Sequence, residues 1–195
     1  MARPREFDTT QALDRAMEVF WAQGYDATSL CDLLCAMVLS KSSLYETFGS
    51  KHELYLAALD HYNRNVTAKH VAAVIAAHAS PKAGIAAVFH GLIDNMIGAE
   101  GGCCGCFVNN AASEVAPRDP AAARRVCDGL GHVEAAFCEA LGRARAAGEI
   151  PDHRDTQALA RYLNSSLNGL MVMAKARPEP GALEDVARIV LQALD

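Results

Sequence analysis

The stretch SKSSLYETFGSK, residues 40–51, decides the fold. Ser40 is a residue type favoured at helix starts, and Gly49 interrupts the helical pattern, so a helix of about two turns is expected. Leu44 and Phe48 lie one turn apart and would fix this helix to a core. A helix so short gains little stability from its own burial, and its other side chains are short or polar. They are therefore suited to contact a partner, such as the base edges or phosphates of DNA.

Two more helices are expected before this stretch. The first runs from about Asp8 to Gln23, where apolar residues recur at helical spacing. The second is short and begins after Thr28, a favoured N-cap residue type. A turn over about 36–39 joins it to the helix that begins near Ser40. Two short helices joined by a tight turn and braced by a longer helix predict a helix-turn-helix head.

The rest of the chain shows helical periodicity and no convincing alternating strand pattern. A long fourth helix is expected from Lys51 to about Ala79. Further helices are expected at 82–98, 105–115, 119–147, 153–175 and 181–194, with Gly or Pro at the breaks. The sequence therefore predicts an all-α protein, with a three-helix DNA-binding head over residues 1–50 and a helical body over residues 51–195.

The composition limits the class of protein. The chain has 195 residues, of which 51% are hydrophobic, and no apolar run approaches the roughly 20 residues that a membrane span needs. The N-terminus has no apolar signal region, so we expect a cytoplasmic protein with reduced cysteines and no membrane association. The formal net charge is −5, and residues 1–55 carry eight acidic against five basic side chains. That balance disfavours a protein that coats nucleic acid, but it is compatible with a small reading head.

Two segments carry a family resemblance: TTQALDRAMEVFWAQGYDATSLCDLL at 9–34 and SKSSLYETFGSKHELYLAAL at 40–59. They resemble the DNA-binding head of the TetR family of transcriptional repressors, and the likeness covers residues 3–60. The later helices match that family in number and length, and GCFVNNAASEVAPRDP at 105–120 resembles the start of its helix six in one branch. The resemblance implies a sequence-specific repressor whose second domain, residues 51–195, binds a small-molecule effector and forms a homodimer.

The matching positions imply the contacts to double-stranded operator DNA. The recognition helix would present Lys41, Ser42, Ser43, Tyr45 and Thr47. Thr28 and Ser29 at the second helix, and Lys51 at the fourth, would meet phosphates, because helix N–H groups and the ammonium attract negative charge. Arg3 and Arg5 would reach the minor groove or the DNA backbone.

The last two helices carry the expected dimer interface. Helix 153–175 combines large apolar residues with Ser166 and Gly169, which permit close approach of helices, and helix 181–194 carries a broad apolar stripe. The alternative is that both stripes face their own core. Similarity to the family also implies an internal effector pocket, although Met and aromatic residues at helical spacing are more often core. The candidate lining residues are Phe89, Met96, Phe107, Asn110, Phe137 and Tyr162.

Cys103, Cys104 and Cys106 lie together in GGCCGC, just before a predicted helix. A thiol at a helix N-terminus has a lowered pKa, so we expect Cys106 above all to sense oxidants or electrophiles. A C-x-C pair can bind Cu(I), whereas a zinc site needs four ligands, and we expect no metal and no cofactor. Cysteines can also be small buried hydrophobes. That interpretation fits Cys31, Cys35, Cys127 and Cys138.

Two other functions stay open. A helical ligand-binding protein with weakened DNA binding is suggested by the negative head and by Cys31, where the family commonly has Arg. It is also suggested by Met37 in the turn, where the family commonly has Gly and a positive φ would cost about 1 kcal/mol or more. A cysteine-dependent enzyme would need a His base such as His90 or His132, and no motif supports one. We therefore expect a regulator, not an enzyme, that is released from DNA by a small molecule or by thiol modification.

Overall fold

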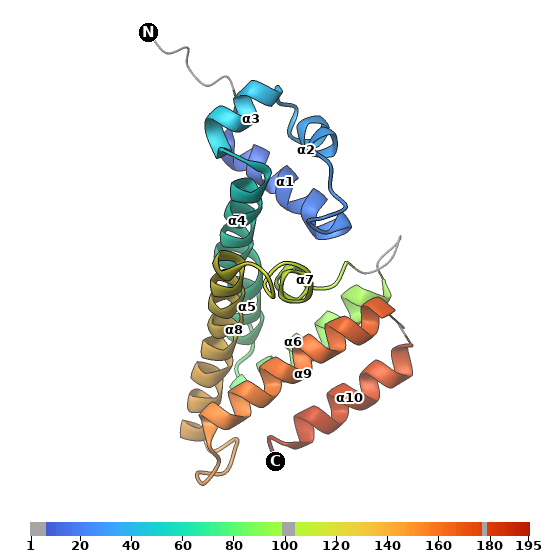
Figure 1. The fold of residues 1–195 in the computed structure, drawn as a ribbon. Coiled ribbons are helices and arrows are strands. Elements are labelled where there is room, and N and C mark those ends of the chain that lie inside the picture. The colour runs from blue at the N-terminus through green and yellow to red at the C-terminus, as the bar shows by residue number, and fades with distance from the viewer. Residues whose placement is uncertain (1–6, 99–103, 177–178) are drawn as a thin grey trace.

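The computed structural model describes residues 7–98, 104–176 and 179–195, and in these ranges it contains helices and loops but no strand (Figure 1). The predicted all-α fold is thereby confirmed for the described chain; the predicted site residues Arg3, Arg5 and Cys103 lie outside these ranges. The head consists of α1 (Thr9–Gln23), α2 (Leu30–Met37) and α3 (Lys41–Phe48). The body contains α4 (Lys51–Tyr62), α5 (Ala68–Ala76), α6 (Pro81–Ile97), α7 (Phe107–Glu114), α8 (Pro120–Ala146), α9 (Thr156–Ala176) and α10 (Pro180–Gln192). No helix in the described part of the chain is long and apolar enough to cross a membrane.

Serine side chains fix the starts of the two short head helices. Ser40 caps α3, and Ser29 forms a reciprocal capping box with Asp32 at the start of α2. The predicted N-cap at Thr28 was wrong. The Thr28 side chain is buried, and its hydroxyl donates to the carbonyl oxygen of Gly24 at 2.6 Å. Thr28 therefore closes the loop between α1 and α2 instead of starting α2.

The turn between α2 and α3 needs a left-handed residue, but at Val38 instead of Met37. Val38 has φ 55° and ψ 47°, and its side chain is 75% exposed. Met37 is the last residue of α2 and is buried, so the residue that bears the cost of a positive φ is Val38, one position after the one considered from the sequence. A β-branched residue is strained in this conformation because its side chain crowds the backbone carbonyl that follows. The turn thus holds strain that a glycine would relieve.

The predicted long helix from Lys51 to Ala79 has a change of helix type at its centre. α4 continues into a π-helical segment, η1 (Asn63–Thr67), and then into α5. The side chain of Asn63 is buried, and its amide donates to the carbonyl oxygen of Arg125 in α8 at 2.8 Å. This bond holds η1 against α8.

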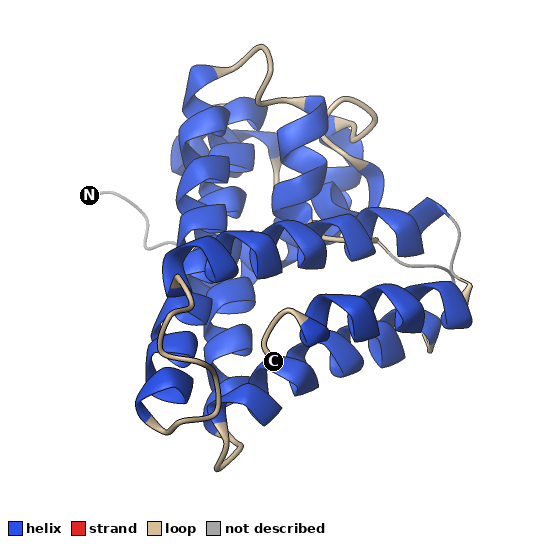
Figure 2. Ribbon diagram, turned by 90° about the horizontal axis from the view of Figure 1, so that it is seen from below, coloured by secondary structure: helices blue, strands red, loops and turns tan. Residues whose placement is uncertain are grey.

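Two hydrophobic cores divide the molecule, and they do not follow the order of the chain. One core joins α5, α6, α8, α9 and α10, and the view from below shows the described chain as helices joined by loops (Figure 2). The other core joins α1, α2 and α3 to α4, α7 and the first turns of α8. Figure 1 shows α7 lying crosswise beneath the head. Although α7 is remote from the head in sequence, it is part of the head's core.

Candidate DNA-binding surface and effector cavity

Leu44 and Phe48 fix the recognition helix α3 to the core, and its other side chains are exposed or half-buried. Leu44 is fully buried. The side chains that remain exposed or half-buried include the predicted contact residues Lys41, Ser42, Ser43, Tyr45 and Thr47. The ammonium of Lys41 lies 6.0 Å from the centre of the Tyr45 ring, so a positive charge and a phenol hydroxyl sit together on this surface. Contact of these residues with DNA stays a prediction, and α3 presents a surface suited to it.

The predicted phosphate contacts lie around the starts of α2 and α4. Ser29 is exposed at the start of α2. Thr28 is buried and its hydroxyl donates to Gly24, so the Thr28 side chain is engaged within the head, and its contact with a phosphate stays a prediction. The ammonium of Lys51 donates to the carbonyl oxygen of Tyr25 at 2.6 Å and lies 4.4 Å from the centre of that ring. Because a lysine has three N–H donors, Lys51 can hold Tyr25 and still meet a phosphate.

Aromatic rings connect the head to the body. Tyr55 on α4 packs edge-on against Phe107 of α7 with ring centroids 5.6 Å apart, and burial raises the pKa of the Tyr55 hydroxyl. Phe107 in turn meets Tyr62, which packs against Trp21 of α1 at 5.2 Å. The indole N–H of Trp21 donates to the carbonyl oxygen of Gly105 at 3.0 Å. The last turn of α1 is therefore tied to the loop that precedes α7.

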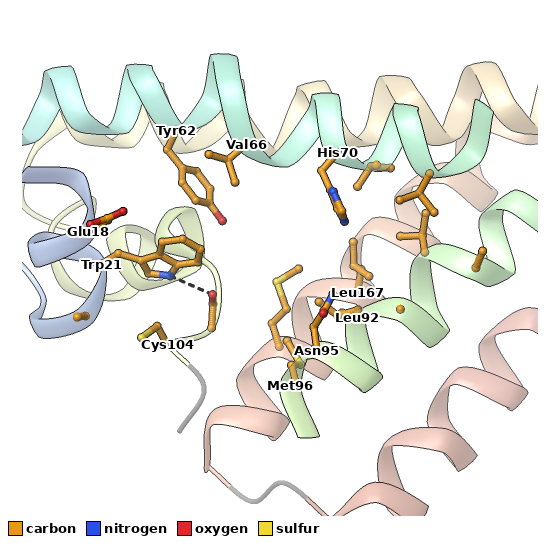
Figure 3. Close-up of a pocket in the computed structure, with 18 residues that line it drawn as sticks. Glu18, Trp21, Tyr62, Val66, His70, Leu92, Asn95, Met96, Cys104 and Leu167 are labelled. Carbon is orange, nitrogen blue, oxygen red and sulfur yellow. Dashed lines mark hydrogen bonds between the residues drawn. The ribbon is translucent and has the colours of Figure 1, made fainter. Parts of the chain in front are cut away.

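A cavity of about 540 Å³ lies at this junction, and most of its wall is apolar (Figure 3). Helix α1 of the head contributes Glu18, Trp21 and Ala22 to the wall. The body contributes Tyr62, Val66, Val71, Val74, Val88, Leu92, Met96, Leu167 and Met171, together with Cys104 and Gly105. The wall also holds three polar residues, Glu18, His70 and Asn95, which are exposed. The cavity suits an apolar small molecule that carries a few polar groups.

Met96 is the one predicted pocket residue that lines this cavity. Phe89 and Phe137 stack on each other in the body core with centroids 6.2 Å apart, and Phe107 is buried in the aromatic junction. Tyr162 is 41% exposed on the surface of α9. None of these four residues lines this cavity, because helical spacing shows that residues share a face but not which neighbour that face meets.

Asn110, the sixth predicted residue, lines a more polar hollow of about 370 Å³ beside the cavity. Its amide oxygen accepts from the ammonium of Lys175 at 3.1 Å, and its amide nitrogen donates to the carbonyl oxygen of Cys104 at 3.0 Å. Trp21 and Met171 line both hollows, and sequence reasoning did not place Trp21 in a pocket. The signal for Trp21 was present, since it is the only tryptophan of the chain and ends the apolar face of the first helix.

Cys104 and Cys106 differ in exposure. Cys104 is exposed and lines the cavity. Cys106 stands at the start of α7, as predicted, but it is buried, and burial raises the pKa of its thiol in spite of the N–H groups of the helix start and the Tyr62 hydroxyl. The predicted lowered pKa of Cys106 was therefore wrong. The expected burial of Cys31, Cys35 and Cys127 was also wrong, since all three are exposed. No group of three His, Cys, Asp or Glu side chains in the described ranges is placed to hold a metal ion.

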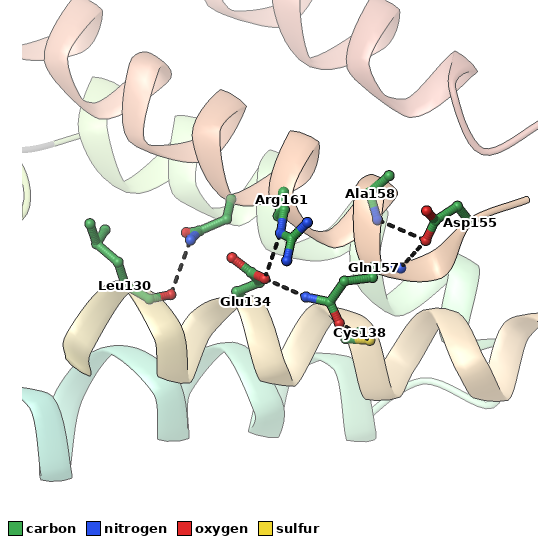
Figure 4. Close-up of polar contacts among 8 residues, drawn as sticks. Leu130, Glu134, Cys138, Asp155, Gln157, Ala158 and Arg161 are labelled. Atoms are coloured by element: carbon green, nitrogen blue, oxygen red, sulfur yellow. Dashed lines mark hydrogen bonds and ion pairs between the residues drawn. The ribbon is translucent and has the colours of Figure 1, made fainter. Parts of the chain in front are cut away.

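Polar side chains bind one face of α9 to α8 (Figure 4). The guanidinium of Arg161 lies 3.2 Å from a carboxylate oxygen of Glu134, to which Gln157 also donates. The amide of Asn164 donates to the carbonyl oxygen of Leu130 at 3.0 Å. Other positions of α9 present apolar or small residues to the surface, namely Tyr162, Ser165, Gly169, Val172 and Met173, and α10 adds Ile189. Apolar surface of this kind is typical of a protein interface.

Known proteins resemble this chain over its full length. The family model of the bacterial regulatory proteins of the tetR family matches residues 12–58, and the model of the tetracyclin repressor-like C-terminal domain matches residues 84–190. The uncharacterized HTH-type transcriptional regulator YezE of Bacillus subtilis is 37% identical over the whole of both chains. The HTH-type transcriptional repressor ComR of Escherichia coli is 34% identical over 96% of this chain and 87% of its own.

Among solved structures, the TetR family transcriptional regulator CifR gives a close match. A cysteine mutant of CifR, complexed with 26-base-pair double-strand operator DNA, is 33% identical to this chain. The alignment covers 99% of this chain and 100% of CifR, with a TM-score of 0.85.

Proposed function

The chain belongs to the TetR family of bacterial transcriptional regulators, and on that premise we propose that it is a homodimeric repressor that leaves its operator when a small molecule fills the cavity. Its helix-turn-helix head makes it a DNA-binding transcriptional regulator. The observation that carries the proposal is that both the head and the body line the cavity. Trp21 belongs to the head, whereas Met96 and Met171 belong to the body. An occupant would touch both parts and bias their relative position, because a ligand shifts an equilibrium toward the arrangement it fits better.

The α3 surface would read the operator. Lys41 and Tyr45 stand exposed on it, and Lys51 stands at the start of α4, where an ammonium and helix N–H groups favour a phosphate. The operator-bound CifR relative supports this placement. Because the head is acidic overall, its affinity for arbitrary DNA would be low and its salt dependence shallow.

The exposed faces of α9 and α10 would form the dimer interface. Half-sites read by paired heads lie about 34 Å apart, one helical turn of DNA, so the two heads must be held at a fixed separation. Val172 and Ile189 are 59% and 53% exposed, which leaves apolar surface for a second copy. Gly169 and Ser165, also exposed, would let the paired helices approach closely.

Thiol modification would be a second route of release. Cys104 is exposed on the cavity wall, so an adduct on its sulfur would occupy the same space as an effector. Cys106 would react after local opening, since it is buried. We propose no catalytic role, no metal and no cofactor, and action in the cytoplasm, where chromosomal DNA lies.

The proposal is tested by filling the cavity without a ligand. A duplex is selected from random sequence by the wild type, and its affinity is then measured for Met96→Trp and for His132→Trp, a control at an exposed position of α8 outside the proposed dimer interface. Met96→Trp should lower the affinity by about tenfold, because the larger ring occupies the cavity as an effector would and favours the arrangement of head and body that accommodates it. His132→Trp should leave the affinity close to that of the wild type.

Two outcomes would count against the proposal. If Met96→Trp keeps full affinity while it stays folded, the cavity does not control the heads. If the wild type selects no duplex at all, the chain is a helical ligand-binding protein with weakened DNA binding, as its negative head and Cys31 would then indicate.

A further inference from the structure

The loop between α1 and α2 is held by a residue of the body. The backbone N–H groups of Tyr25 and Asp26 donate to the two carboxylate oxygens of Glu114, at 2.9 Å and 2.8 Å. Glu114 is the last residue of α7, nearly ninety positions further along the chain. Hydrogen bonds from backbone N–H groups to an ionised carboxylate are among the stronger ones in proteins. One carboxylate therefore binds two consecutive peptide groups of the head, and we call this pair of hydrogen bonds the Glu114 grip.

Gly24 makes the space for this grip. It ends α1 with φ 87°, a conformation that L residues with a side chain rarely adopt. A Cβ atom placed on Gly24 would lie 2.9 Å from one oxygen of Glu114, closer than real Cβ atoms come to such an atom. The glycine thus serves both the turn and the close approach of the carboxylate.

The same loop is gripped from its other side by α4. The carbonyl oxygen of Tyr25 accepts from the ammonium of Lys51 at 2.6 Å, while the N–H of Tyr25 donates to Glu114. Helix α7 therefore binds the backbone N–H of Tyr25, and helix α4 binds its carbonyl oxygen. Since α2 begins at Leu30 shortly after this loop, the loop's position sets where α2 and the recognition helix start.

Helix α7 also runs between the cavity and this loop. Cys104 and Gly105, in the loop that precedes α7, line the cavity. The carbonyl oxygen of Gly105 accepts a hydrogen bond from the indole N–H of Trp21. Its other end carries Glu114. Displacement at the cavity would therefore reach the head through α7 as well as through α4, because a packed helix moves as a rigid element.

We propose that Glu114 is a positioning residue that fixes the angle of the helix-turn-helix head on the body, and so determines which spacing of DNA half-sites the protein accepts. This inference rests on the proposed function, since spacing has meaning only for a dimer that binds DNA. Without these two hydrogen bonds, the loop between α1 and α2 would be held by Lys51 of α4, the Trp21–Gly105 bond would still hold the end of α1, and the head would sample a wider range of angles. Such a dimer would bind its preferred duplex less selectively against duplexes with altered spacing.

The test compares Glu114→Gln with Glu149→Gln. Glu149 is a matched control, because its carboxylate also accepts a hydroxyl and a backbone N–H, from Ser80 and Lys82, both at 2.9 Å, but entirely within the body. Affinity is measured for the duplex that the wild type selects and for the same duplex lengthened by one base pair between its half-sites. The ratio of the two affinities should fall by about tenfold in Glu114→Gln, because an amide nitrogen now faces an N–H donor. It should stay unchanged in Glu149→Gln.

A merely structural role would not move this ratio, since lost stability lowers the active fraction equally for both duplexes. Trp21 provides a second readout as the only tryptophan of the chain. Its emission maximum should shift in Glu114→Gln and not in Glu149→Gln, since Trp21 lies at the junction that Glu114 holds. An unchanged ratio in a folded Glu114→Gln would overturn the inference.

Hydrogen exchange of the wild type gives a measurement that needs no variant. The amides of Tyr25 and Asp26 should be protected both in the unbound dimer and in its complex with the selected duplex. Rapid exchange of both amides in the complex would overturn the inference, because the grip would then be absent from the DNA-bound form. If the wild type selects no duplex, both the proposed function and the spacing role fall, whereas an unchanged ratio removes the spacing role alone.

Discussion

The indole nitrogen of Trp21 lies 3.0 Å from the carbonyl oxygen of Gly105, and this hydrogen bond ties the end of α1 to the loop before α7. The bond closes a ring of contacts, because Trp21 also packs edge-on against Tyr62 of α4. The two residues of the bond both line the cavity. The contact that stabilises the head–body junction is therefore also part of the wall that an effector would meet.

Replacing Trp21 with Phe should lower the free energy of unfolding by about 1–2 kcal/mol, because the variant loses a hydrogen bond and some apolar burial. The measurement is urea unfolding followed by circular dichroism, since the variant has no tryptophan emission. Tyr45→Phe, which removes a hydroxyl from an exposed ring on α3, should change the same quantity by less than about 0.5 kcal/mol. Equal effects in the two variants would mean that the junction adds nothing to stability.

The helices and the head were within reach of sequence reasoning, because their signals are local. Ser40 and Leu44 define α3 by residue type and spacing alone, and both behave as predicted. The lining of the cavity could not be predicted from the sequence, because it depends on which helix faces meet across the molecule. Phe89 and Phe137 have the same sequence signature as Met96, yet they face each other in the body core.

Two further features could not be predicted from the sequence: which residue of the α2–α3 turn is left-handed, and whether the helix start or burial dominates the pKa of Cys106. The sequence pointed to Met37 as the turn position where a positive φ would be costly, but the left-handed residue is Val38, since a one-residue shift in the end of α2 leaves the helical pattern unchanged. At Cys106 the helix start lowers the thiol pKa and burial raises it, and burial prevails. Which effect wins depends on how deeply the thiol is packed, and that depth is set by residues far along the chain.

Val38→Gly should stabilise the protein. The valine has φ 55° and is 75% exposed, so the change relieves backbone strain of about 1–2 kcal/mol and removes few contacts. The glycine destabilises the folded state by about 0.5–1 kcal/mol, because the unfolded chain gains conformational entropy, so the free energy of unfolding should still rise. Thermal unfolding should show a higher Tm for Val38→Gly. The control Met37→Gly should instead lower the Tm strongly, since Met37 is buried within α2; a rise there would put the strain back at Met37.

Alkylation should reach Cys104 well before Cys106. Cys104 is exposed, whereas Cys106 is buried and its thiol has a pKa raised above its ordinary value of 9.0 by that burial. Because the thiolate is the reactive form, the rate at Cys106 should stay low at neutral pH and rise only in alkaline solution. Peptide mapping by mass spectrometry after brief iodoacetamide treatment at several pH values gives both rates. Preferential labelling of Cys106 at neutral pH would restore the sensor role first predicted for it.

The capping box of α2 should make stability depend on acid pH. Hydrogen bonds from the hydroxyl and backbone N–H of Ser29 lower the pKa of the Asp32 carboxyl below its usual 3.8. A carboxyl with a lower pKa in the folded state stabilises the fold above its usual pKa, and this contribution is lost as the pH falls through the lowered value. Asp32→Asn should therefore have a lower Tm than the wild type at neutral pH, with the gap closing in strong acid. Glu139→Gln, an exposed substitution on α8, should show a smaller gap at neutral pH; a gap for Asp32→Asn that persists unchanged in acid would contradict the role of the charge.

Gly169→Leu should separate dimerisation from folding. Gly169 is exposed on α9, and a Cβ atom placed there would meet nothing within 4 Å, so the single chain has room for a larger side chain. If α9 pairs closely with the α9 of a second copy, the leucine should hold the two helices apart and weaken the dimer. Gly131→Leu on α8 is a matched control, because Gly131 is also exposed with open space around it. Sedimentation velocity should find a monomer for Gly169→Leu and a dimer for Gly131→Leu, with the same helix content by circular dichroism. A Gly169→Leu protein that sediments as the wild type does would place the interface on another face of the body.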